Sequence, residues 1–320
     1  MKIFFLIIVL FVLDTLTFGQ AVPAPEENIP FLVTFGKNGS KKWGDDDFVQ
    51  SFFFVIPETH KTPVFIRIFD PGTSGKFDEQ QGAFDTKTRY SVYGGKGCIT
   101  EKDARSTVPT GNFKSGNLLA TKTFSAEYDG EWYTLGPFNP TAGENAPQYG
   151  GNVIKIIAEG ISGNDGNLYR YFLSTSPTKN IPIEGGNAFT FEYTFRLNDN
   201  PNEISHVYPY IDDKVISIRQ GNFDWDNDGA LKVVTVSRLA IHLKKSGDGD
   251  WQMSEHEVLE SEKGSTFDVQ FHKNKAKPAQ NNNLTFFLTN HYGEALPFFT
   301  IPIGGIPKPK TSIKVTPIKK

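Results

Sequence analysis

Cysteine is nearly absent from this chain of 320 residues, and Cys98 is the only one. A single cysteine cannot form an internal disulfide, so the fold must be held together by its hydrophobic core and by any metal ion that it binds. We expect Cys98 to be a small buried residue rather than a reactive thiol, because buried free cysteines usually behave as small hydrophobic residues.

Long apolar segments are missing as well, with one exception at the N-terminus. An uninterrupted hydrophobic run, residues 3–13, follows a basic start, and small residues stand at Gly19 and Ala21. The run is shorter than the roughly 20 residues that cross a bilayer, but this arrangement is typical of a secretory signal peptide. The sequence therefore predicts a signal peptide over residues 1–21, cleaved after Gly19 or Ala21. We expect a secreted protein, periplasmic or extracellular, with no membrane span.

An excess of positive charge is also lacking. The 33 Lys and Arg residues are balanced by 36 Asp and Glu residues, which leaves a formal net charge of −3. Such a chain offers no broad basic surface, so we expect neither nucleic acid nor anionic lipid as a partner.

Familiar catalytic motifs are absent too. The sequence has no His-Glu-x-x-His zinc motif, no Gly-x-Ser-x-Gly turn and no glycine-rich phosphate loop, and its 6 histidines are scattered. We therefore expect a binding protein. A glycosidase, however, needs only two carboxylates at a suitable separation. The alternative is thus a carbohydrate-active enzyme with an Asp/Glu pair in a cleft between domains.

The chain is instead rich in phenylalanine and glycine, with 28 and 30 residues. Apolar residues recur at every second position in short runs bounded by Gly, Pro, Asn and Asp, which is the pattern of β-strands. No longer stretch shows a helical period with capping residues, so the sequence predicts an all-β protein. The expected strands are 31–35, 51–56, 64–69, 89–93, 118–124, 132–135, 153–158, 169–174, 188–197, 206–211, 215–219, 231–236, 240–244, 252–259, 266–272, 284–289 and 297–303.

One segment interrupts the series of strands. Residues 175–186 contain two prolines and two glycines, which favours a linker between domains. We predict two consecutive antiparallel β-sandwich domains, of the jelly-roll or Ig-like type, after the signal peptide. The expected divisions are a leader at 22–30, the domains at 31–178 and 186–306, and a flexible basic tail at 307–320.

The sharpest chemical signal is an acidic loop between two expected strands. Asp224, Asp226 and Asp228 alternate in the sequence and are closed by Gly229. Alternating carboxylates followed by a glycine present oxygens to calcium in many proteins. A helix–loop–helix calcium site is excluded, because no helices flank the loop and Thr235 stands where a bidentate glutamate is required.

Further ligands for this site must come from elsewhere, and the nearest candidates are Asp212 and Asp213, one strand earlier. The alternative is a solvated acidic turn with Trp225 buried on its other side.

A second set of acidic loops lies in the first half of the chain. If these loops meet, their carboxylates and amide oxygens form a ligand set of the calcium type. The alternative is that Asp and Asn serve turn geometry alone. The candidate ligands are Asp70, Asp78, Glu79, Asp85, Asp165 and Asn167.

Several aromatic residues are candidates for stacking on sugar rings, as sandwich binding modules do. Trp251 begins an expected strand beside a Gly/Asp turn, and Tyr208 and Tyr210 lie close together in another strand. Trp132, in contrast, is expected in the core. A polysaccharide, or another protein of the cell envelope, is therefore the expected partner.

Four segments of the chain also carry a resemblance to a known group. Residues 67–71 (Arg-Ile-Phe-Asp-Pro), 88–97, 132–138 and 165–169 resemble those of uncharacterised exported β-sandwich proteins of Gram-negative bacteria. The Phe-Gly-Gln sequence near the signal cleavage point is similar to that of proteins exported by the Bacteroidota. The resemblance implies an exported, non-enzymatic protein and transfers no active residue. The sequence thus predicts an exported binding protein with calcium-stabilised loops.

Overall fold

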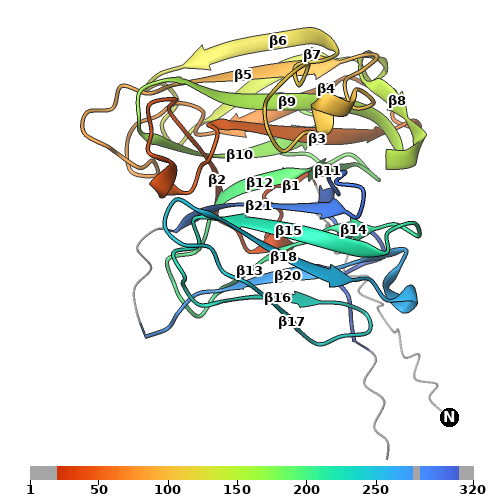
Figure 1. Cartoon of the computed structure of the whole chain (residues 1–320). Helices are drawn as coiled ribbons and strands as arrows, with labels where there is room; N and C mark the ends of the chain where they lie inside the picture. Colours follow the sequence, from red (N-terminus) through yellow and green to blue (C-terminus); the bar gives the residue numbers. More distant parts are fainter. Residues whose placement is uncertain (1–19, 277–281, 310–320) are drawn as a thin grey trace, which may run out of the picture.

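A computed structural model of the chain describes residues 20–276 and 282–309 (Figure 1). The predicted fold class is confirmed: the chain is all-β, and its strands pair antiparallel. Within the described residues, no helix is long and apolar enough to cross a membrane. The predicted signal peptide lies outside these residues except for Gln20 and Ala21, and so does most of the predicted basic tail.

The regular elements are strands and short 3-10 helices. The strands are β1 (Ala21–Val22), β2 (Phe31–Phe35), β3 (Val49–Pro57), β4 (Val64–Phe69), β5 (Lys87–Gly94), β6 (Asn117–Phe124), β7 (Trp132–Phe138), β8 (Glu144–Ala146), β9 (Gly151–Ser162), β10 (Gly166–Ser174), β11 (Asn187–Thr190), β12 (Glu192–Arg196), β13 (Ile204–Val207), β14 (Tyr210–Ile211), β15 (Ser217–Phe223), β16 (Ala230–Val234), β17 (Ile241–Leu243), β18 (Trp251–Glu257), β19 (Ser265–Thr266), β20 (Asp268–His272), β21 (Asn283–Asn290) and β22 (Phe298–Phe299). The 3-10 helices are η1 (Pro25–Glu27), η2 (Lys41–Trp43), η3 (Lys102–Arg105), η4 (Pro140–Ala142), η5 (Pro147–Tyr149) and η6 (Glu260–Glu262).

The strands form two face-to-face packings, which we call the first and second sandwich. In the first sandwich, a seven-stranded sheet packs on β2, β10, β4 and β7; its order is β22-β11-β3-β9-β5-β6, and β8 also pairs with β9. In the second, β12, β21, β15 and β18 pack on the four-stranded sheet β13-β20-β16-β17. Aromatic pairs join the layers, for example Phe52 with Tyr171 in the first sandwich and Phe195 with Phe271 in the second. Alternation of apolar and polar residues along each strand produces these two-layered cores.

The two sandwiches share one sheet, which differs from the expected pair of separate domains. Strand β2 pairs with β10 on one side and with β12 on the other, so a nine-stranded sheet runs from β18 to β7. In Figure 1, β2 and β12 lie at the junction between the upper and lower groups of strands. Strand β11, which follows the predicted linker 175–186, pairs with β3 of the first sandwich. The linker therefore separates two series of strands but not two independent sheets, because β12 occupies what would otherwise be an open strand edge.

The N-terminal segment, which includes the predicted leader at 22–30, is integrated into the fold. Strand β1 pairs with β10, and Val22 and Ile29 belong to the main hydrophobic core. The Gln20 side-chain amide donates hydrogen bonds to the carbonyl oxygens of Ile183 (2.6 Å) and Gly186 (3.1 Å). The apolar residues of this segment are buried against strands far away in the sequence.

Candidate functional site

The predicted acidic loop follows β15, and the structure brings part of it together. Carboxylate oxygens of Asp224 and Asp226 lie within 4.8 Å of each other and of Asp248, a residue from the loop before β18. Asp224 is buried, whereas Asp248 is exposed. The cluster does not include the predicted ligands Asp228, Asp212 or Asp213. The third carboxylate therefore comes from the Gly-Asp-Gly-Asp turn at 247–250. The sequence had drawn attention to this turn only because it precedes Trp251.

Backbone hydrogen bonds hold the two acidic loops side by side. The Asp224 N–H donates to the carbonyl oxygen of Asp250 (3.2 Å), and the Asn227 N–H donates to that of Ser246 (2.7 Å). Asp224, Asp226 and Asn227 have positive φ angles, a backbone conformation that Asp and Asn tolerate better than most residues. The loop therefore curls, so its carboxylates do not follow the alternation of an extended strand.

Of the predicted ligands outside this cluster, Asp213 is exposed, and Asp228 and Asp212 have other partners. The Asp228 carboxylate accepts a hydrogen bond from the Asn274 N–H (3.1 Å). The Asp212 carboxylate accepts one from the Lys214 N–H two residues later (2.8 Å), which is the geometry of a local turn. These residues serve loop geometry.

A lysine from the first half of the chain reaches the acidic cluster. The Lys42 Nζ lies 2.9 Å from Oδ2 of Asp248. This hydrogen bond and the negative charges around it raise the pKa of Lys42. A metal ion at the cluster must therefore compete with an ammonium group for Asp248.

The acidic loops of the first half do meet, but most of their carboxylates form hydrogen bonds or ion pairs with neighbouring protein groups. Asp165 is buried and accepts hydrogen bonds from the N–H groups of Gln81 (2.7 Å) and Asp85 (3.1 Å) and from the Thr86 hydroxyl (2.9 Å). Glu79 forms an ion pair with Arg196 of β12. Asp85 is exposed. These predicted ligands therefore cap loops or join strands.

Asp70, Asp78 and Asn167 form the remaining part of that predicted set. Asp78 accepts hydrogen bonds from the N–H groups of Leu168 (2.6 Å) and Ser74 (2.7 Å), and burial raises its pKa to about 9. Oδ2 of Asp70 and Oδ1 of Asn167 are buried and have no hydrogen-bond partner among the described residues. Buried oxygens without a partner suit a bound water molecule or a hard cation.

The predicted aromatic ligands lie in three different environments. Tyr208 is only 1% exposed, and its hydroxyl donates to the carbonyl oxygen of Glu26 (2.8 Å), so its assignment as a ligand residue was wrong. Tyr210 is half-buried and packs on Phe299. Trp251 is half-buried, and its ring lies 5.2 Å from Phe223 and 5.0 Å from Phe287 on the sheet face that points away from the core.

A pocket that the sequence did not reveal lies at the junction of the two sandwiches. This cavity, of about 400 Å³, is lined by the N-terminal segment 21–30, by Trp132 and Arg170, and by the amides of Asn180 and Asn198. We call it the junction pocket. Trp132 is half-buried rather than in the core, so the expectation for it was also wrong.

Strand register explains why Trp132 points outward. Arg170, Phe69 and Trp132 are direct partners across β10, β4 and β7, so their side chains share one face of the sheet. The guanidinium of Arg170 lies 4.6 Å from the Phe69 ring centre, and that of Arg67 lies 4.8 Å from the Trp132 ring centre. The sequence carried one sign of this outward face, which is the alternation of Tyr169, Arg170 and Tyr171. Both tyrosines point into the core, so Arg170 lies on the opposite face of the sheet.

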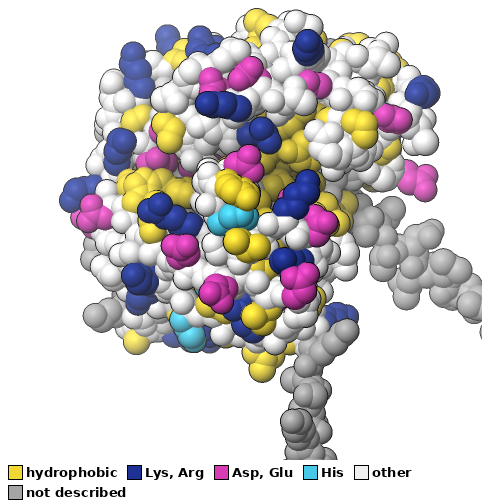
Figure 2. Space-filling model, turned by 45° about the vertical axis from the view of Figure 1, so that its right-hand side comes forward, with side chains coloured by type: hydrophobic (Ala, Val, Ile, Leu, Met, Phe, Trp, Pro, Cys, Tyr) yellow, Lys and Arg dark blue, Asp and Glu magenta, His cyan; other side chains and the backbone are white. Residues whose placement is uncertain are grey.

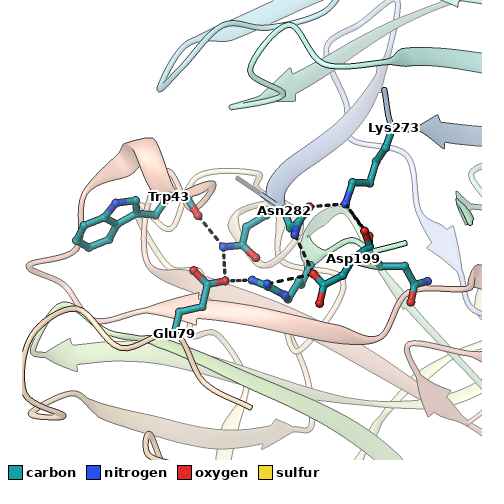
Figure 3. A network of polar contacts seen from close by, with 8 residues as sticks. Trp43, Glu79, Asp199, Lys273 and Asn282 are labelled. Atoms are coloured by element: carbon teal, nitrogen blue, oxygen red, sulfur yellow. Dashed lines mark hydrogen bonds and ion pairs between the residues drawn. The ribbon is translucent and has the colours of Figure 1, made fainter. Parts of the chain in front are cut away.

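Polar contacts continue from this face to the second sandwich (Figure 3). The Asn283 amide donates to the Trp43 carbonyl oxygen (3.0 Å) and to Oε1 of Glu79 (2.7 Å). Lys273 donates to the side-chain oxygen of Asn282 (2.6 Å), whose amide donates to Asp199 (2.9 Å). The network thus ties loops of the first sandwich to β12 and β21.

Comparisons with known proteins add little to this description. No protein-family model matches the chain, and no curated protein matches it. Among solved structures, it is similar to the N-terminal CBM22-1-CBM22-2 tandem domain of Xyn10C from Paenibacillus barcinonensis. The identity is 11% and the TM-score 0.15, over 75% of this chain and 79% of that chain. A TM-score of this size carries no inference about fold or function, so the fold class rests on the sheets described above.

Proposed function

We propose that this chain is a non-catalytic binding protein that takes a polysaccharide chain in the junction pocket. The observation that carries the proposal is the lining of this pocket, in which a half-buried tryptophan stands beside amide and guanidinium groups. An indole face packs against the apolar face of a sugar ring, and amides and guanidinium groups pair with its hydroxyl oxygens. A volume of about 400 Å³ lies in the range of small-ligand sites.

The charge of the pocket favours a sugar that carries carboxylates. Among the residues that the structure describes, no acidic side chain lines it, whereas Arg170 does. Nε of Arg170 is buried and has no hydrogen-bond partner among the described residues. A buried donor without a partner costs free energy, and a carboxylate or hydroxyl oxygen of a ligand would satisfy it.

The larger cavities give the enzyme alternative less support. Within the described part of the chain, no carboxylate lines the junction pocket or a second cavity of about 660 Å³ around Ile303 and Ile306. A cavity that does contain Asp47 and Glu192 has a volume of about 20 Å³, which is too small for a sugar ring. Substrate-sized space and carboxylates therefore lie in different places, and a glycosidase requires them together.

The face shown in Figure 2 carries charged side chains of both signs. These side chains are interspersed, and hydrophobic side chains gather across the middle of the face. We further propose that the protein is exported and that calcium stabilises the loops at Asp224, Asp226 and Asp248, where the carboxylate oxygens converge. Calcium there displaces Lys42 from Asp248.

Affinity electrophoresis with soluble polysaccharides tests the proposed function. Polygalacturonate serves as the acidic probe, and xylan and a β-glucan serve as neutral probes. We expect polygalacturonate to retard the protein most, and Trp132→Ala and Arg170→Gln to weaken that retardation at least about tenfold. Trp251→Ala, which removes a half-buried tryptophan from the second sandwich, is the matched control and leaves binding unchanged. Loss of binding in Trp251→Ala alone, or no retardation by any probe, would contradict the proposal.

A further inference from the structure

A cluster of acidic residues outside the sites described above lies where the two sandwiches meet. Asp45, Asp46 and Asp47 follow η2 and precede β3, and their carboxylate oxygens lie within 4.8 Å of one another. Phe48 has a positive φ angle of 64°, which turns the chain sharply at the end of this triplet. Consecutive residues that would alternate in a strand are thereby gathered on one side.

Backbone N–H groups orient two of these carboxylates. Asp45 accepts hydrogen bonds from the N–H groups of Phe35 (2.8 Å) and Phe48 (2.9 Å), and Asp47 accepts one from that of Val49 (2.9 Å). These donors hold the loop rigidly against β2 and β3. A ligand for the cluster would therefore meet oxygens that are already positioned.

Glu192, the first residue of β12, brings a fourth carboxylate from the second half of the chain, and it lines one small cavity together with Asp47. Its negative charge and those of the three aspartates act on one another, and burial raises the pKa of Glu192 well above its usual value. Burial likewise raises the pKa of Asp45 to about 7 and that of Asp46 to about 6. Lys41 is the lysine that offsets this charge at Asp46 and Asp47, and it is exposed.

Two oxygens of the cluster are left without partners. Oδ1 of Asp46 and Oε2 of Glu192 are buried, and neither has a hydrogen-bond partner among the described residues. A cavity of about 20 Å³ is lined by Asp47, Glu192 and Gln50, which is room for about one water molecule or ion. Of the two residues with unpartnered oxygens, Glu192 lines the cavity and Asp46 does not, but Asp46 lies within the same carboxylate cluster as Asp47. A buried oxygen without a partner at a space of that size points to a bound species that accepts its lone pairs.

We propose that Asp45, Asp46, Asp47 and Glu192 form a second cation site, which holds a hard divalent ion of the calcium class. Carboxylates alone, without His or Cys, select calcium or magnesium over zinc. Calcium suits the irregular geometry of a loop and a strand end better than magnesium, which demands a regular octahedron. The ion joins the loop 44–48 of the first sandwich to β12 of the second, so its binding reinforces their junction.

Calorimetric titration with calcium chloride, on full-length protein stripped with chelator, tests this site. We expect Asp46→Asn and Glu192→Gln to weaken calcium binding at least about tenfold and to reduce the rise in melting temperature that calcium produces. Both substitutions keep the side-chain shape, and near-ultraviolet circular dichroism checks the fold. Asp248→Asn removes one carboxylate from the other acidic cluster and serves as the matched control. This variant is expected to retain calcium binding at the site of Asp46 and Glu192.

Two outcomes would overturn the proposal. One is that wild type and Glu192→Gln show the same calcium affinity and the same melting shift. The other is that neither responds to calcium while both variants are more stable than wild type at pH 7, because carboxyl groups that share protons are relieved by an amide. Magnesium in place of calcium, at equal ionic strength, is expected to give a smaller melting shift.

Discussion

Glu27 is the most completely buried carboxyl group near the N-terminus, with 0% exposure. Its Oε2 accepts hydrogen bonds from the Ala24 N–H (2.7 Å) and the Tyr193 hydroxyl (3.1 Å), while Oε1 is buried without a hydrogen-bond partner among the described residues. Burial raises the pKa of Glu27 to about 8. The folded protein therefore holds this proton at pH values where an unfolded chain has released it.

Replacing Glu27 with Gln is expected to flatten the pH dependence of stability. The pKa is higher in the folded state, so the favourable contribution of Glu27 is complete below about pH 4.5 and is lost as the pH rises through about 8. A shift of this size corresponds to a few kcal/mol, to order of magnitude. In urea unfolding, the free energy of unfolding of Glu27→Gln should increase relative to that of wild type as the pH rises from about 5 to about 9. Glu26→Gln, at an exposed neighbour, should change nothing, and parallel pH curves for Glu27→Gln and wild type would refute the effect.

Some functional residues could be predicted from the sequence, and others could not, for reasons of backbone geometry. Asp224 and Asp226 were recognisable because alternating aspartates before a glycine are a known loop pattern, and the structure brings them together. Asp45, Asp46 and Asp47 were missed, because consecutive residues of an extended chain point to opposite faces. Their convergence depends on the turn at Phe48, and no local sequence pattern predicts that turn.

At the scale of single elements, alternation predicted where the strands lie but not how they pair. The sequence predicts one strand over 188–197, yet the structure divides it at Phe191 into β11 and β12. Strand β11 pairs with β3 in the seven-stranded sheet, whereas β12 pairs with β2 and β21 in the nine-stranded sheet. A continuous apolar run fits both sheets equally well, so only the tertiary structure reveals that the chain changes sheet here.

The ion pair of Arg196 with Glu79 connects β12 to the loop after β4, and we expect it to stabilise this junction measurably. Both side chains are less than a quarter exposed, at 24% and 21%, so water screens them less than a surface pair. A double-mutant cycle of Glu79→Gln and Arg196→Gln should give a coupling free energy of about 1 kcal/mol or more. The exposed pair of Lys42 with Asp248 (65% and 49% exposed) is the control and should give a smaller coupling. A coupling no larger than that of the exposed pair would show that the partial burial of Arg196 and Glu79 does not strengthen their ion pair.

At the scale of the whole molecule, the two sandwiches are joined by backbone pairing and by a common core. One cluster of buried hydrophobic residues extends from Phe52 and Ile154 in the first sandwich to Val269 and Phe286 in the second. The sequence revealed a break at 175–186, because Pro and Gly are visible locally. It did not reveal that β11 and β12 return to strands of the first half, since their pairing partners lie more than a hundred residues away.

This arrangement predicts what happens when the predicted linker is cut. Residues 177–181 are exposed, so a specific protease site inserted after Thr178 should be cleaved in the folded protein. Cleavage breaks one peptide bond but leaves the β2–β12 and β3–β11 pairs and the common core intact. The two fragments should therefore elute together from a sizing column under native conditions and separate only in denaturant. The Gln20 contacts with Ile183 and Gly186, on the far side of the cut, add to this association.

Independent domains joined only by a linker behave differently, because few contacts cross between them. Two separate native peaks after cleavage would mean that the shared sheet does not hold the halves together in solution.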